Sequence, residues 1–215
     1  MIKKIVSPYG KTAFLNDLKK DCVLLDVGCG NDSPKKIKKI IPKCLYYGID
    51  VDDYNQSSSE FADEYIITNS KSFVDSIKKY NNFFDAIISS HNLEHCEDWK
   101  GTLHAMYSAL KKDGKMYISF PSHKTKAFPS RTGTLNFFDD ITHKNLIYFN
   151  EFYQELKFLK SEILFSTETY QPSILFFLGF LLEPISKFKK KVLPGTWAYY
   201  GFEQIFIIKK KLDYH

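Results

Sequence analysis

Short apolar runs alternate with segments of helical periodicity between residues 20 and 122 of this chain. The first run, 22–27, is continuously apolar up to Asp26, as expected for a strand that is buried on both faces of a parallel sheet. Strands are also predicted at 45–49, 65–67, 84–89 and 115–120, and helices at 14–20, 34–41, 72–79 and 99–112. Strands that alternate with helices form βαβ units, so the sequence predicts an α/β protein with a mostly parallel sheet.

The length of the chain fits one domain. A chain of 215 residues, 44% of them hydrophobic, should bury about 70% of its unfolded surface, which is enough for one sizeable core. This composition excludes a disordered chain, and the low Gly and Pro content excludes a collagen-like one. We therefore predict a single domain over residues 1–215, with its core at about 20–122.

Cysteine usage and the first residues indicate the compartment. The cysteines at 22, 29, 44 and 96 form no CxxC pair and no metal-finger spacing, and residues 1–10 lack the apolar region of a signal peptide. We therefore expect reduced thiols and a cytoplasmic protein. The longest apolar run, 174–182, is shorter than the ~20 residues that a membrane-spanning helix needs.

Positive charge is concentrated in three lysine clusters, although the net charge is only +5. The clusters lie at 35–39, 187–191 and 209–211. They are typical of solvated faces, and the alternative is that they attract an anionic partner such as a phosphate ester. No run combines basic residues with aromatic stacking platforms, so a nucleic acid partner is not expected.

A glycine turn after the first strand predicts a nucleoside site. Asp26-x-Gly28-x-Gly30 is followed 20 residues later by Asp50, at the end of the second strand. Glycines let the backbone approach a ligand, and an acidic group at the second strand accepts hydrogen bonds from ribose hydroxyls. A dinucleotide fingerprint needs a third glycine near 33, where Ser33 stands, and Asp26 would repel a pyrophosphate. The pattern disfavours an NAD-dependent oxidoreductase and favours S-adenosylmethionine, whose ammonium group suits Asp26.

Four successive segments resemble the motifs of class I S-adenosylmethionine-dependent methyltransferases. They are VLLDVGCGN (23–31), YYGID (46–50), FDAIISSHNLEH (84–95) and LKKDGKMYISFP (110–121). The resemblance implies a Rossmann-like, seven-stranded, mostly parallel sheet with helices on both faces and an antiparallel last strand. That strand would be FEQIFIIKK (202–210), inserted beside the strand before it.

The resemblance also implies which residues contact the donor, S-adenosylmethionine, and its product S-adenosylhomocysteine. Asp26 and the turn from Gly28 through Cys29 to Gly30 would hold the methionyl end, and Asp50 with Val51 the ribose. Asn69 and Ser70 would flank the adenine, and Ser90 and His91 would lie beside the methyl donor.

The segment after the fourth strand matches H-x-x-E-H, at His91, Glu94 and His95. Zinc peptidases carry this pattern within a helix and need a further ligand, whereas here it follows a strand. The favoured interpretation is that Glu94 and His95 cap the next helix and that no metal is held. The alternative is a divalent metal bound by His91, Glu94 and His95 near the acceptor.

Acceptor chemistry is predicted to lie in the aperiodic loop 122–145 and in an insertion at 170–198. The stretch RTGTLNFFDDITH (131–143) is similar to a segment of methyltransferases associated with bacterial surface-polysaccharide synthesis. Arg131 is predicted to bind a phosphate. Hydroxyls or an amine are assigned to Asn136, Asp139 and Asp140. The candidate general bases are His91, His123 and His143, with Asp139 or Asp140 as alternatives.

The expected function is transfer of a methyl group to a sugar or sugar-nucleotide hydroxyl of a surface-glycan precursor, with a phosphorylated or nucleotide-linked acceptor. Two alternatives stay open: N-methylation of a phosphorylated amino alcohol, and a catalytically silent, cofactor-binding regulatory module. The segment 173–191 is predicted to be an apolar helix that ends at Pro184. Globular packing or a homodimer contact is favoured for it over a helix on a membrane surface.

Overall fold

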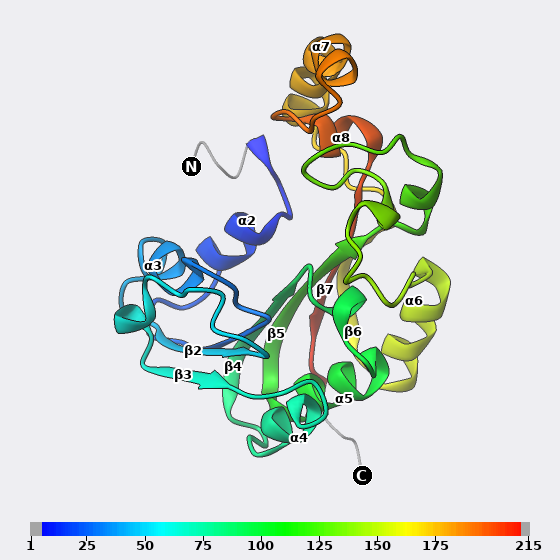
Figure 1. The fold of residues 1–215 in the computed structure, drawn as a ribbon. Coiled ribbons are helices and arrows are strands. Elements are labelled where there is room, and N and C mark those ends of the chain that lie inside the picture. Colours follow the sequence, from blue (N-terminus) through cyan, green and yellow to red (C-terminus); the bar gives the residue numbers. More distant parts are fainter. Residues whose placement is uncertain (1–5, 212–215) are drawn as a thin grey trace.

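The computed structural model describes residues 6–211, and its seven strands form one sheet in the order β3-β2-β1-β4-β5-β7-β6 (Figure 1). The strands are β1 Val23–Val27, β2 Leu45–Asp50, β3 Glu64–Ile67, β4 Phe84–Ser90, β5 Leu110–Pro121, β6 Glu162–Thr167 and β7 Glu203–Lys209. Strands β1 to β5 are parallel, while β7 is antiparallel to both β5 and β6. The predicted fold class is confirmed.

Helices cover both faces of this sheet (Figure 1). On one face lie α4 Phe73–Lys78, α5 Trp99–Ala109 and α6 Phe149–Phe158, and on the other α2 Lys11–Asn16 and α3 Ser33–Lys38. Two buried clusters follow from this arrangement, because apolar strand residues point alternately to the two faces. Leu103 of α5 and Phe152 of α6 belong to one cluster, and Phe14 of α2 and Ile37 of α3 to the other.

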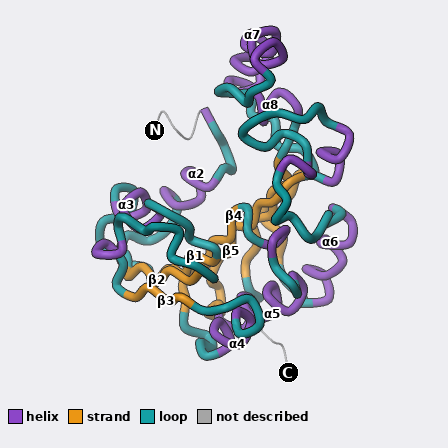
Figure 2. Tube along the Cα trace, in the orientation of Figure 1, coloured by secondary structure: helices purple, strands orange, loops and turns teal. Residues whose placement is uncertain are grey.

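The aperiodic segment after β5 is a long surface loop with short 3-10 turns (Figure 2). The turns in the loops are η1 Ser59–Phe61, η2 Leu93–His95, η3 His123–Ala127 and η4 Phe137–Asp139. Side chains fix the conformation of the last one. Asn136 Oδ1 accepts from Phe138 N at 2.9 Å, and Asp139 Oδ2 accepts from Asn136 N at 2.8 Å. The loop is therefore stabilised by its own capping box.

Helix α7 (Ser173–Lys189) projects from the sheet, and its neighbour is α8 (Thr196–Tyr200) (Figure 1). The predicted end at Pro184 is wrong, because the helix continues through Pro184 to Lys189. Proline removes the hydrogen bond to the carbonyl four residues earlier, that of Phe180. Phe180 and Pro184 are both exposed, so water can satisfy this carbonyl. No helix within 6–211 is long and apolar enough to cross a membrane.

Candidate active site

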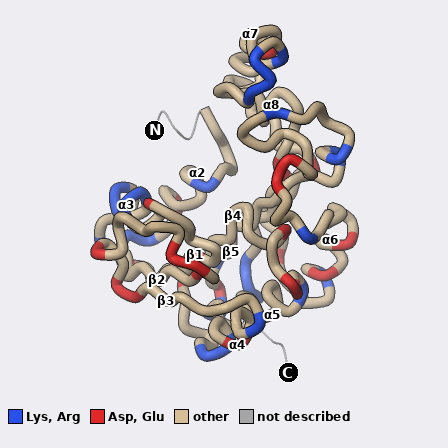
Figure 3. The backbone as a smooth tube through the Cα atoms, in the orientation of Figure 1, with Lys and Arg blue, Asp and Glu red and all other residues tan. Residues whose placement is uncertain are grey.

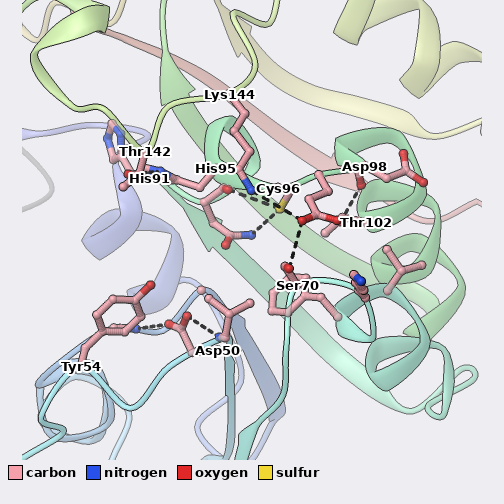
Figure 4. Close-up of a pocket in the computed structure, with 18 of the residues that line it drawn as sticks. Asp50, Tyr54, Ser70, His91, His95, Cys96, Asp98, Thr102, Thr142 and Lys144 are labelled. Atoms are coloured by element: carbon pink, nitrogen blue, oxygen red, sulfur yellow. Dashed lines mark hydrogen bonds and ion pairs between the residues drawn. The ribbon is translucent and has the colours of Figure 1, made fainter.

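A cavity of about 820 Å³ opens at the carboxyl ends of β1, β2 and β4 (Figure 4). The strand order reverses between β1 and β4, and such switch points are where α/β sheets bind ligands. Gly28 follows β1, Asp50 ends β2 and His91 follows β4, and all three line the cavity. The topology thus brings together residues that are more than 60 positions apart in the chain.

Asp50 is oriented by the backbone around it. Its Oδ2 accepts from Gly30 N and its Oδ1 from Val51 N, each at 2.8 Å. Burial raises the pKa of the Asp50 carboxyl, although these two amide bonds act in the opposite direction. Each carboxylate oxygen keeps a further lone pair for a ligand. Asp50 is therefore a fixed acceptor pair suited to two adjacent hydroxyls.

The two glycines of the turn have different roles. Both have positive φ, +71° at Gly28 and +57° at Gly30, a conformation that glycine adopts without strain. A Cβ at Gly28 would lie 2.4 Å from Asn92 Oδ1, so the backbone there packs closely on the loop after β4. A Cβ at Gly30 would meet no atom within 4 Å, so this backbone faces open space in the cavity.

Asp26 lies behind the cavity wall, with 1% of its surface exposed. Its Oδ2 accepts from Ser33 Oγ at 2.5 Å and from the Tyr46 hydroxyl at 2.8 Å. Its Oδ1 has no hydrogen-bond partner among the described residues, and Lys11 Nζ is 4.0 Å away. A buried carboxylate oxygen without a partner is costly, so Asp26 retains an attraction for a cationic group above the turn.

The other residues expected to contact the donor divide into two groups. Val51 and Ser70 line the cavity. Cys29 packs in the core cluster of α2 and α3, and Ser90 Oγ bonds Ser119 Oγ at 3.1 Å. Asn69 Oδ1 accepts from Ser72 N at 3.0 Å. The structure does not bring the Cys29, Ser90 and Asn69 side chains to the cavity wall.

His91 lines the cavity, but both of its ring nitrogens are occupied. Nε2 is 2.7 Å from Glu203 Oε1 and Nδ1 is 3.2 Å from Glu94 Oε1. Burial alone lowers the pKa of His91, but the bonds to Glu203 and then Glu94 outweigh it and raise the pKa to about 10. An imidazolium between two carboxylates has no free lone pair, so this geometry does not provide the predicted general base.

The other two predicted bases lie away from the wall of the cavity. His123 stacks on Tyr148 with ring centroids 5.0 Å apart, and its Nδ1 is 3.3 Å from Glu168 Oε1. His143 is 4% exposed, and its Nδ1 donates to the carbonyl of Phe137 at 2.6 Å. Neither residue lines the cavity, although Thr142 and Lys144 on either side of His143 do.

The predicted phosphate site at Arg131 is wrong. Its guanidinium is 3% exposed and donates two bonds to Glu183 of α7, at 2.6 and 2.7 Å, and one to Ser186 Oγ at 2.6 Å. A buried bidentate pair leaves no donor directed at a ligand in the cavity. Asn136 and Asp139 stabilise the loop, as described above, while Asp140 lines the cavity.

Partial burial acts to raise the pKa of the Asp140 carboxyl, but its hydrogen bonds from Thr142 Oγ1 and Thr142 N outweigh burial and lower the pKa.

The predicted capping of the next helix by Glu94 and His95 is also wrong. Asp98 is the N-cap of α5, and its Oδ1 accepts from Gly101 N at 2.8 Å.

Several residues of the cavity were not predicted from the sequence. Tyr54 lies beside Asp50, and Thr142 and Lys144 form the wall across from them, together with His95 (Figure 4). Tyr54 follows Asp50 by four residues, so the sequence could have predicted an aromatic side chain beside the nucleoside. Lys144 gave no signal, because its place beside the cavity depends on how the 122–148 loop folds back.

These residues fit S-adenosylmethionine. Asp50 offers two acceptors for the ribose, and Gly30 gives open backbone for the methionyl end. Asp26 adds a buried carboxylate oxygen that accepts no hydrogen bond from the described residues. When bound, the cofactor supplies a sulfonium methyl group for transfer. The wall across from Asp50 is polar, as an acceptor for that methyl group requires.

Comparison with known proteins agrees with this arrangement. A family model described as a methyltransferase domain matches residues 6–156. An uncharacterised protein of Methanocaldococcus jannaschii is 32% identical over 126 residues, which are 55% of this chain and 32% of that protein. The matched segment therefore spans about a third of that relative's length.

Two solved structures show the same fold at low identity. A SAM-dependent methyltransferase from Archaeoglobus fulgidus is 20% identical, with a TM-score of 0.56 over 89% of this chain and 87% of that one. Phosphoethanolamine N-methyltransferase 2 from Haemonchus contortus, in complex with S-adenosyl-L-methionine, is 15% identical, with a TM-score of 0.57 over 93% of this chain and 51% of that one.

The family match covers well over half of the chain and includes the turn after β1, the end of β2 and the segment after β4. The expectation of the family and of its cofactor is confirmed. With this cavity at the switch point of its sheet, the chain belongs to the methyltransferase domain family, whose methyl donor is S-adenosylmethionine.

Proposed function

We propose that the protein methylates a hydroxyl of a small polar acceptor, and that this acceptor is a sugar or sugar-nucleotide precursor of a surface glycan. The observation that carries the proposal is the polar wall formed by His95, Thr142 and Lys144, across the cavity from Asp50. Hydrogen-bonding side chains in a concave site recognise polyhydroxylated ligands, whereas an apolar acceptor would leave them unpaired.

The chemistry is an in-line displacement. The bond from sulfur to the methyl carbon breaks, a bond from the acceptor oxygen to that carbon forms, and the hydroxyl proton leaves to solvent. Positioning of the two reactants alone contributes roughly 7–11 kcal/mol to lowering the barrier. In this proposal a shared cavity for donor and acceptor provides the positioning. His91 does not act as a base, because Glu94 and Glu203 hold both of its ring nitrogens.

The acceptor class has two supports. The stretch 131–143 resembles a segment of methyltransferases associated with surface-polysaccharide synthesis, and its residue Asp140 lines the cavity. Lys71 and Lys144 also line the cavity and would attract a phosphate or nucleotide group on the acceptor. In this proposal Lys144 takes the role predicted for Arg131.

A second candidate function is N-methylation of a phosphorylated amino alcohol. Glu97, Asp98 and Asp140 also line the cavity and would attract a substrate ammonium. The fold likeness to a phosphoethanolamine N-methyltransferase is in keeping with this candidate. An amine acceptor would need only to arrive unprotonated.

Two measurements test these proposals in order. Calorimetric titration should show binding of S-adenosylmethionine and S-adenosylhomocysteine and none of NADH. Methyl transfer is then followed by mass spectrometry with a panel of sugar nucleotides, sugar phosphates and phosphoethanolamine. Methylated sugars support the first candidate, and methylation of phosphoethanolamine alone would replace it with the second.

A further inference from the structure

We propose that Glu94, His95 and His143 bind a divalent transition-metal ion at the acceptor end of the cavity. One ligand atom from each of the three side chains lies within 4.8 Å of the other two. Two imidazoles and one carboxylate are a common ligand set for such ions. The set differs from the one that the H-x-x-E-H pattern suggested, because His91 is bonded to Glu203 and His143 comes from a distant loop.

Hydrogen bonds fix which nitrogen of each histidine is available. His143 Nδ1 lies 2.6 Å from the Phe137 carbonyl, which only accepts, so Nδ1 carries the proton and Nε2 keeps its lone pair. Thr142 Oγ1 donates its one proton to Asp140 Oδ1 at 2.6 Å, so it must accept from His95 Nδ1 at 2.9 Å. Both imidazoles therefore present an Nε2 lone pair, with Nδ1–H held by an oxygen, as metal-binding histidines do. Asp140 Oδ2 lies 4.0 Å from His143 Nε2 and adds a negative charge beside the proposed site.

Glu94 provides the third ligand and an independent indication. The side chain is 1% exposed, and Oε2 has no hydrogen-bond partner among the described residues, while Oε1 holds His91. A buried carboxylate oxygen without a partner is costly, and a cation beside the two imidazoles would compensate it. Backbone bonds from Lys144 and Asn145 to the Glu94 carbonyl, at 2.7 and 3.0 Å, hold the loop of His143 against this residue.

The site is open on one side. Of the three ligands, His95 lines the cavity, next to Thr142 and Asp140, so a metal bound to three protein ligands would be reached by an acceptor from this side. For the proposed O-methylation, on which this step rests, an acceptor hydroxyl bound to the metal loses its proton to water more readily. Metal binding itself does not depend on which acceptor is methylated.

Metal binding is tested on the whole protein after treatment with a chelator and dialysis. Calorimetric titration with Zn²⁺ and with Mn²⁺ should show one site per chain, and Co²⁺ should give a visible absorption band. His143→Ala and His95→Ala should each weaken binding at least tenfold. His104→Ala is the matched control, because His104 pairs with Glu155 on the surface and should bind the metal like the wild type.

Retention of S-adenosylhomocysteine affinity shows that each variant is folded, and His95, which is half-buried, is the safer of the two substitutions. Equal metal affinity in the wild type, His95→Ala and His143→Ala would overturn the metal site, as would the absence of a stoichiometric site. Metal binding without methylation of any sugar acceptor would leave the site standing and refute the proposed function.

A second inference rests on the outer face of α7. Ile174, Leu178, Leu181, Ile185 and Phe188 follow one another at helical spacing, and all are exposed, Leu181 by 70% and Phe188 by 88%. Nothing in residues 6–211 covers this apolar stripe, and the helix stands away from the sheet (Figure 1).

We propose that this face binds the surface of an anionic lipid bilayer. Exposed lysines at 187 and 189–191 lie at the end of the helix (Figure 3), and its one acidic residue, Glu183, is paired with Arg131. An apolar stripe bordered by lysines, without free carboxylates, complements lipid tails and anionic headgroups.

Sedimentation with vesicles tests the membrane proposal. Wild-type protein should bind phosphatidylglycerol-containing vesicles and bind phosphatidylcholine vesicles at least tenfold more weakly. Leu181→Glu with Phe188→Glu should abolish binding, whereas Phe158→Glu, at an exposed phenylalanine on α6, should not. Equal binding by wild type and the double variant would overturn the proposal, as would a dimer in light scattering that dissociates in the double variant without any vesicle binding.

Discussion

At the scale of single residues, the spacing of Asp50 from the glycine turn identified a fixed acceptor pair. Asp50→Ala should weaken S-adenosylhomocysteine binding at least a hundredfold, because two bonds to a charged acceptor contribute about 3 kcal/mol or more together. Calorimetry measures the change. Asp52→Ala is the control, since Asp52 is exposed and accepts from the backbone N of Asp53. An unchanged affinity of Asp50→Ala for S-adenosylhomocysteine would show that Asp50 does not bind the ribose.

Donor affinity should also depend on pH through the same carboxyl. Ribose hydroxyls donate to the carboxylate, so protonation of Asp50 removes an acceptor. Because burial raises the pKa of Asp50, affinity should begin to fall at a higher pH than for an ordinary aspartate with a pKa of about 3.9. Titrations between pH 8 and pH 4.5 measure this loss. The Asp50→Asn variant should show a weaker dependence, and an equal slope would assign the effect to another group.

The role of a residue could be predicted where the groups that it bonds lie near it in the sequence. Gly28 and Gly30 form the turn itself, and Asp50 accepts from Gly30 N of that turn and from its own neighbour Val51 N, so their spacing predicted that they line the cavity. His91 lines the cavity as expected, but its predicted role as a base and the predicted phosphate site at Arg131 do not fit their partners, Glu203 and Glu183, which are 112 and 52 residues away. A side chain's charge state depends on what folds against it, and no local pattern contains that information.

At the scale of elements, the ion pair between Arg131 and Glu183 joins the 122–148 loop to α7. Glu183→Gln should lower the free energy of unfolding by about 3–5 kcal/mol, because it leaves the buried Arg131 charge without its partner. Urea unfolding measures the loss. Glu151→Gln, in an exposed pair with Lys100, should leave the midpoint unchanged. A similar midpoint in wild type and Glu183→Gln would show that the loop is held by other contacts.

The pH dependence of this pair has a defined sign. The Arg131 guanidinium lowers the pKa of the Glu183 carboxyl in the folded protein below its unfolded value. The stabilisation is therefore fully present above the unfolded pKa of about 4.3 and is lost as pH falls through the lower, folded pKa. Unfolding curves of wild type and Glu183→Gln should differ at pH 7 and approach each other in acid. A constant difference would contradict the pairing.

Elements with strong periodicity were predicted to within a few residues, while those set by packing were not. The strands of the core appear where apolar runs predicted them. Helix α8 was missed, since its five residues follow Gly195 and show no period. Helix α7 passes Pro184 because its outer face is in solvent, a fact that the sequence does not contain.

At the scale of the whole molecule, donor binding should stabilise the fold by mass action. S-adenosylhomocysteine at 100 times its dissociation constant should add about 2.7 kcal/mol to the free energy of unfolding. For a chain of this size that corresponds to a rise of roughly 5–10 °C in Tm. Differential scanning calorimetry measures the shift, with NADH at the same concentration as the control. An equal shift with NADH would indicate non-specific binding.

The position of β7 has a consequence for synthesis. Strand β7 (Glu203–Lys209) is the last of the seven strands to be synthesised. It nevertheless lies between β5 and β6 in the sheet, and β6 pairs with it. Until these residues emerge, the nascent chain holds β6 without a neighbour and His91 without Glu203. The parallel half of the sheet can form during translation, but the Glu203 carboxylate that bonds His91 at the cavity wall arrives only with the last strand made.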